Sequence, residues 1–147
     1  MDWKQEAIDK LRGYAAHKNA LDSIPMELER LKAAYTGIRS AKLDGTPTGK
    51  GGGNTREASM LSNIVHRDEL KRRLKEARLW VEIVDGGLSI LDDEERLALD
   101  HCYIHKVKGS INELCYQLSI DTSAAYRRRD IALHRFTQAL YGPLPGL

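Results

Sequence analysis

The stretch ELCYQLSIDTSAAYRRRDIALHRF, residues 113–136, decides the fold predicted for this chain. A short helix with apolar residues inward is expected over Ile111–Leu118, and Ser119–Asp121 should form a turn. A second helix should begin behind a cap at Asp121 or Thr122 and stop at Gly142 and Pro143. A short helix, a three-residue turn and a longer helix predict a helix-turn-helix.

The residue types at fixed places in this stretch support that prediction. Cys115 is small where the second helix should cross the first, and Ile120 can plug the turn. Ala125 is small and faces inward where the two helices meet. Ser110 with Glu113 three residues later predicts a capping box at the start of the first helix.

The outward side of the second helix carries polar and basic side chains near its N-terminal end. In a helix-turn-helix this end reaches base edges and phosphates. We expect Arg127 and Tyr126 to read bases, while Arg128, Arg129, Lys106 and Lys108 hold phosphates. The candidate DNA-binding residues are Thr122, Ser123, Tyr126, Arg127, Arg128, Arg129, Asp130, Lys106, Lys108 and Ser110.

Charge is concentrated in the same stretch. The whole chain has a net charge of only +2, so a nucleic-acid prediction has to rest on local charge. Residues 106–135 hold six Lys and Arg against three acidic residues, a local +3. Basic charge on the recognition helix is what DNA binding requires.

The rest of the chain predicts an all-α protein, in which a long antiparallel helical hairpin (a coiled coil) precedes the helix-turn-helix. Residues 1–42 should form the first coil helix, kinked or restarted near Pro25. Residues 43–55, rich in Gly and Thr, should be a flexible loop, and residues 56–90 the second coil helix. Residues 91–142 should form the helix-turn-helix domain. Whether the coil pairs within one chain or between two chains is left open.

The helix that leads into the helix-turn-helix is expected over about Asp92–His105. Asp92 or Asp93 should cap it, and Leu97, Leu99 and Tyr103 or Ile104 should supply its buried side. Gly86 and Gly87 should weaken the end of the preceding coil helix and mark a joint.

Composition and motifs exclude several other classes. No apolar run approaches the roughly 20 residues needed to span a bilayer, and the amphipathic N-terminus does not resemble a signal peptide. Cys102 and Cys115 fit a reducing compartment, so a cytoplasmic protein is expected. No catalytic, metal or cofactor site is expected. Trp3 and Trp80 are interpreted as packing residues, with a partner contact as the alternative for Trp3.

The segment SINELCYQLSIDTSAAYRRRDIALHRF resembles the C-terminal DNA-binding region of sigma-70-type factors. The preceding LDDEERLALDHCYIHKVKGS resembles the helix that leads into that region. The layout of the whole chain, from KLRGY through a Gly-rich break to the sigma-like end, is similar to that of the ArpU/RinA-like phage regulators. The sequence departs from the sigma pattern in two ways: Ser119 stands where the turn usually has Gly, and the pair Ala124-Ala125 replaces a common Thr-Val pair.

This resemblance implies a phage or prophage activator of late genes in the cytoplasm of the host bacterium. It implies duplex DNA as the ligand and RNA polymerase as a candidate second partner. Two alternatives stay open: a small terminase-like DNA-packaging protein, and an adaptor that binds polymerase or a sigma factor without binding DNA. A homodimer formed through the coil is a further expectation.

Overall fold

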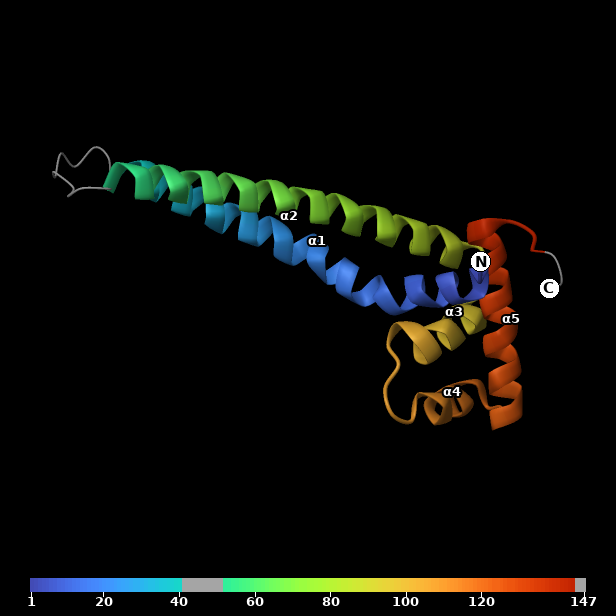
Figure 1. Ribbon diagram of the computed structural model, residues 1–147. Coiled ribbons are helices and arrows are strands. Elements are labelled where there is room, and N and C mark those ends of the chain that lie inside the picture. Colours follow the sequence, from blue (N-terminus) through green and yellow to red (C-terminus); the bar gives the residue numbers. More distant parts are fainter. Residues whose placement is uncertain (41–51, 145–147) are drawn as a thin grey trace. The chain divides into compact units, whose positions relative to one another are not determined.

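The computed structural model describes residues 1–40 and 52–144, and every element within them is helical, as predicted. Two helices of 38 residues each come first and four shorter elements follow (Figure 1). The elements are α1 (Trp3–Ser40), α2 (Gly52–Ser89), α3 (Asp93–Leu99), the π-helical turn η2 (Asp100–Ile104), α4 (Ser110–Leu118) and α5 (Thr122–Tyr141).

Helix α1 continues through Pro25, so the restart considered for this position does not occur. Proline removes one backbone donor, but apolar residues on both sides of it still lie on one inward-facing side of the helix. Ile24 and Leu28 are partly buried and Leu31 is buried, and this packing holds the helix together across the missing hydrogen bond. A kink at Pro25 stays a prediction.

Helix α2 begins at Gly52, earlier than the predicted start at residue 56. Arg56 lies in its first turns and donates from Nε to the carbonyl of Ile38 at 3.1 Å and from Nη2 to that of Arg39 at 3.2 Å. These are the last carbonyls of α1, which have no partner within the helix, so Arg56 fastens the two helix ends together. The other residues of the predicted loop, 43–51, lie outside the described residues.

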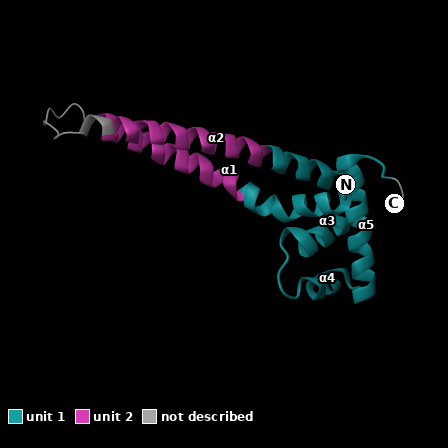
Figure 2. Ribbon diagram, viewed as in Figure 1, with its two compact units in different colours: residues 1–18, 79–147 teal, residues 19–78 magenta. Residues whose placement is uncertain are grey.

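The chain forms two compact units, coloured separately in Figure 2. Unit 1 comprises residues 1–18 and 79–147, and unit 2 comprises residues 19–78. The sequence placed the domain boundary between residues 90 and 91 instead. The difference arises because the ends of both long helices pack with the helix-turn-helix.

Unit 2 is an antiparallel helix pair formed within one chain. The buried amide of Asn63 donates to the carbonyl of Leu31 at 2.9 Å, while Arg56 lies near Ile38, so residue numbers rise in opposite directions along the two helices. Asn63 also accepts from Arg67 Nε at 2.9 Å. A polar side chain satisfied at a buried coil position fixes the register of the pair.

Unit 1 joins the N-terminal part of α1 and the end of α2 to the last helices. Trp80 donates from its indole nitrogen to the carbonyl of Lys10 at 2.8 Å, and Tyr14 donates to Asp85 at 2.6 Å. Gly87 lies directly against the fully buried ring of Phe136 in α5. Helix α2 continues through both glycines to Ser89, and Gly87 makes room for a core aromatic ring.

The two tryptophans both make ring contacts within unit 1. The Trp3 ring lies 4.8 Å from that of Tyr141, and His17 stacks on Trp80 at 4.2 Å between ring centres. The packing interpretation is confirmed for Trp80, which is partly buried. Trp3 packs on Tyr141 but remains 39% exposed, so the partner contact considered for Trp3 stays a prediction. None of the described helices combines the length and the apolar character needed to cross a bilayer.

Candidate nucleic-acid interface

The helix leading into the helix-turn-helix begins at a complete capping box. Asp92 accepts from the backbone N–H of Glu95 at 2.8 Å, and the Glu95 carboxylate accepts from that of Asp92 at 3.2 Å. The hydrogen bond from the backbone N–H of Glu95 holds the pKa of the Asp92 carboxyl below its usual value. Of the two predicted caps, Asp92 is the one used.

The expected single helix over Asp92–His105 changes its winding at Leu99. Helix α3 gives way to η2, in which the backbone N–H of His105 donates to the carbonyl of Asp100 at 2.8 Å, five residues back. This wider turn moves the buried positions by one residue. Leu99 is buried as predicted, but Cys102 takes the inward place that was assigned to Tyr103 or Ile104, both of which are only partly buried.

The core beneath the helix-turn-helix is small and comes from four elements. Ala98, Cys102, Leu114 and Ala125 are buried together, and Ile120 packs against them from the turn. The predicted roles of Ala125 as the small residue at the crossing and of Ile120 as the plug are confirmed. Cys115 and Leu118 are partly buried at the edge of the same cluster.

The turn has the geometry of a helix C-terminus closed by a left-handed residue. Ser119 adopts φ 55°, its N–H donates to the carbonyl of Tyr116 at 3.3 Å, and that of Ile120 donates to Cys115 at 3.1 Å. Asp121 then caps α5 by accepting from the backbone of Ala124 at 2.7 Å. The predicted turn, cap and end of α5 at Gly142 are confirmed.

The predicted capping box at Ser110 is wrong. Gly109, at φ 85°, occupies the cap position, and Ser110 is the first helical residue. The Ser110 hydroxyl accepts from the backbone of Val107 at 2.9 Å, and Glu113 accepts from Gln117 instead. Ser110 is buried, so it braces the loop and offers no side chain to a ligand on the surface.

One face at the start of α5 carries the other predicted residues of that helix. Thr122, Ser123, Tyr126, Arg127 and Asp130 are all exposed. They follow the turn directly and all lie within the first nine residues of α5. The structure thus brings these side chains together on one surface.

The three consecutive arginines have three different environments. Arg128 pairs with Glu94 at the start of α3. Arg129 is partly buried, pairs with Asp130 at 2.9 Å and lies 4.8 Å from the Tyr126 ring. No hydrogen bond or ion pair joins Arg127 to any residue that the structure describes. Arg127 is therefore the arginine of this run whose guanidinium is free for a ligand.

A second ion pair, missed in the sequence, fixes α5 to α3. Arg135 pairs with the buried carboxylate of Glu95 and donates to the carbonyl of Ile90 at 3.3 Å. These partners are 40 and 45 residues away in the chain, so no helical spacing could reveal them. The local sequence places Glu95 in the first turn of the helix, and this position gives no indication of a partner in α5.

The remaining predicted basic residues lie on the loop before α4. Lys106 and Lys108 are exposed, and neither forms an ion pair within the described part of the chain. Within that part, no three His, Cys, Asp or Glu side chains are grouped as metal ligands would be. Burial raises the pKa of the Cys102 thiol, which makes the thiolate rarer at neutral pH.

Comparison of the chain with protein-family models, with curated proteins and with solved structures finds no match among any of them.

Proposed function

We propose that this protein binds duplex DNA in a sequence-specific manner and regulates transcription, in the manner of the phage late-gene activators that its sequence resembles. One observation carries the proposal: a capped α5 follows a closed turn and presents Thr122, Ser123, Tyr126 and Arg127 on a single exposed face. In a helix-turn-helix, this end of the second helix enters the major groove.

The environments of the arginines assign them different roles in this proposal. Arg127 is unpaired among the described residues and reads a base edge, where guanidinium pairs best with guanine. Arg128 must leave Glu94 to contact a phosphate, which reduces its net contribution. Lys106 and Lys108 contribute phosphate contacts that do not distinguish sequences.

The test begins with selection of bound duplexes from a random DNA library by the full-length protein. Affinity for the selected site and for a scrambled duplex is then measured at two salt concentrations. The proposal expects a recovered motif and a specificity ratio of at least about a thousandfold. Weak, salt-steep binding without a motif would contradict it, and a ring-sized mass in solution would then favour DNA packaging.

Two variants test whether Arg127 recognises a base or contributes only its charge to DNA binding. Arg127→Ala should weaken the selected site by about 1–3 kcal/mol and relax the preference at one base position. Arg78→Ala, which removes an exposed arginine from α2, serves as the matched control and should leave the specificity ratio unchanged. Equal losses on selected and scrambled DNA for Arg127→Ala would refute its role in base reading.

RNA polymerase is a second candidate partner, and pull-down by the full-length protein in the presence and absence of the selected duplex tests it. Polymerase binding without any DNA affinity would favour the adaptor alternative. A homodimer through the coil is tested by the mass in solution and by symmetry in the selected motif.

A further inference from the structure

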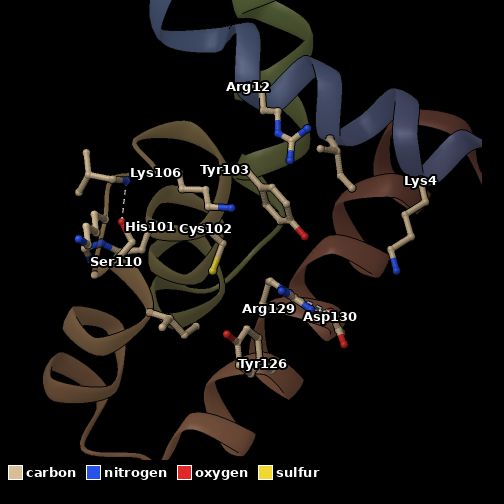
Figure 3. A pocket seen from close by; sticks show the side chains of 15 residues that line it. Lys4, Arg12, His101, Cys102, Tyr103, Lys106, Ser110, Tyr126, Arg129 and Asp130 are labelled. Carbon is tan, nitrogen blue, oxygen red and sulfur yellow. Dashed lines mark hydrogen bonds and ion pairs between the residues drawn. The ribbon is translucent and has the colours of Figure 1, made fainter.

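A hollow of about 520 Å³ lies within unit 1, and Tyr126 and Asp130 of the exposed face of α5 are among its lining residues. Side chains from the start of α1, from η2 and the loop after it, from the start of α4, and from α5 line it (Figure 3). Its charged lining is strongly one-sided: five basic residues face one acidic residue, a net +4. The charged lining residues are Lys4, Arg12, Lys106, Lys108, Arg129 and Asp130.

Most of this positive charge has no internal partner. Arg129 pairs with Asp130 at 2.9 Å. Lys4, Arg12, Lys106 and Lys108 form no ion pair with any carboxylate that the structure describes. Like charges gathered around a hollow repel one another, and a bound anion would relieve that repulsion.

The hollow also has apolar walls that suit a flat ligand. Ile8 and Ile111 line it together with the rings of Tyr103 and Tyr126. In Figure 3 the Tyr103 ring lies between the guanidinium groups of Arg12 and Arg129. Burial raises the pKa of the Tyr103 phenol, so at neutral pH this group is an uncharged hydrogen-bond donor.

We propose that this hollow binds a small phosphate-bearing organic anion with a flat apolar body, of the class represented by a nucleoside monophosphate. Its volume is within the roughly 300–1,000 Å³ usual for small-molecule sites. Arginine pairs with phosphate through two parallel hydrogen bonds, and the tyrosine and isoleucine side chains cover the apolar body.

A phosphate in this hollow could belong to a free small molecule or to the DNA backbone. Two features favour the free molecule: the site is recessed, with the buried Cys102 among its lining residues, and its apolar walls serve no purpose for a bare phosphate. The inference does not depend on DNA binding, because the ligand is tested alone.

The experiment titrates the full-length protein with adenosine 5′-monophosphate, adenosine and inorganic phosphate in the absence of DNA, by calorimetry and by NMR. The monophosphate should bind saturably and more tightly than either of its parts. Arg12→Gln and Lys106→Gln should each weaken it about fivefold, because an exposed charge contact is worth up to this factor.

Two further variants distinguish a specific effect on ligand binding from a loss of folding. Asp130→Asn removes the one acidic group of the lining and should tighten binding about threefold, a gain that misfolding cannot produce. Arg127→Gln removes the same charge as Arg12→Gln, but from outside the hollow, and should leave binding unchanged.

Absence of saturable binding to the wild-type protein would overturn the proposal. So would equal weakening by Arg127→Gln and Arg12→Gln, since that would indicate a diffuse attraction to charge. If Arg12→Gln weakens binding to a scrambled duplex while the monophosphate does not bind at all, the hollow holds a DNA backbone phosphate and the free-ligand proposal fails.

Discussion

Two neighbouring glycines of α2, Gly86 and Gly87, differ in the space that surrounds them. A Cβ atom added at Gly86 would meet nothing within 4 Å, whereas at Gly87 it would lie 2.6 Å from a ring carbon of Phe136. Both residues are helical, and neither has a positive φ. Only the second is required by packing.

Alanine substitutions at these positions should therefore have opposite effects. Gly87→Ala should lower the free energy of unfolding by about 1–3 kcal/mol, because the buried ring and helix must separate. Gly86→Ala should raise it by about 0.5–1 kcal/mol through better helix propensity. Urea denaturation of both variants measures the two changes in the free energy of unfolding. Changes of the same sign would contradict the close approach of α2 to α5.

Ser119 is the one non-glycine residue with positive φ in the described part of the chain. A side chain in the left-handed region costs energy that glycine avoids, and Ser119 is exposed, so little packing would be lost. Ser119→Gly should raise the free energy of unfolding by about 0.5–1 kcal/mol. A thermal melt measures this gain, and a fall in the melting temperature would show that the hydroxyl has a role of its own.

Between elements, the contact that matters most is the attachment of α5 to α3. Glu95 is buried, completes the capping box of α3 and pairs with Arg135 of α5. Glu94 is exposed and pairs with Arg128. Two adjacent carboxylates thus connect the same two helices, one beneath the surface and one on it.

Substitution of each carboxylate in turn should show how much the buried and the exposed ion pair each contribute to stability. Glu95→Ala should lower the free energy of unfolding by about 1–3 kcal/mol, since a cap and a buried partner are lost together. Glu94→Gln should change it by less than about 1 kcal/mol, as is usual for exposed ion pairs. Chemical denaturation compares the two, and equal losses would mean that burial of Glu95 contributes nothing.

At the scale of the whole molecule, one hydrogen bond links stability to alkaline pH. Tyr14 of α1 donates to Asp85 of α2 at 2.6 Å, and burial, followed by this carboxylate, raises the pKa of the phenol from 10.0 to about 12. Between these two values the folded protein retains a proton that the unfolded chain has lost. The free energy of unfolding must therefore fall as the pH rises through this window.

Tyr14→Phe should be less stable than the wild type at neutral pH but should lose less stability between about pH 10 and 12. Urea denaturation at several alkaline pH values gives the two slopes. Parallel slopes would show that other groups, and not Tyr14, carry the alkaline dependence.

The same ion pairs influence the electrostatics of the proposed DNA surface. Glu94→Gln frees Arg128 and removes a negative charge beside α5. Binding to a scrambled duplex should strengthen, and the slope of log affinity against log salt should steepen by about one unit. Fluorescence anisotropy over a salt series measures this; an unchanged slope would place Arg128 outside the DNA contact.

Local sequence determined the features that depend on neighbouring residues. The all-helical class, the turn at Ser119–Asp121, the cap at Asp121 and the end at Gly142 follow from propensity, capping and periodicity within a few residues. The exposed face of α5 follows from helical spacing once Ala125 is placed inward. The spacing of Ser110 and Glu113 wrongly predicted a capping box, because the left-handed Gly109 occupies the cap position.

Only the tertiary structure decided what depends on distant residues. The pairing of the coil helices within one chain, the role of Gly87 beneath Phe136 and the different partners of the arginines come from segments far apart in sequence. The hollow beside α5 likewise gathers Lys4 and Arg12 with side chains about a hundred residues later in the chain. Charge count and periodicity report what a helix carries, whereas packing selects which of those charges remain free to bind.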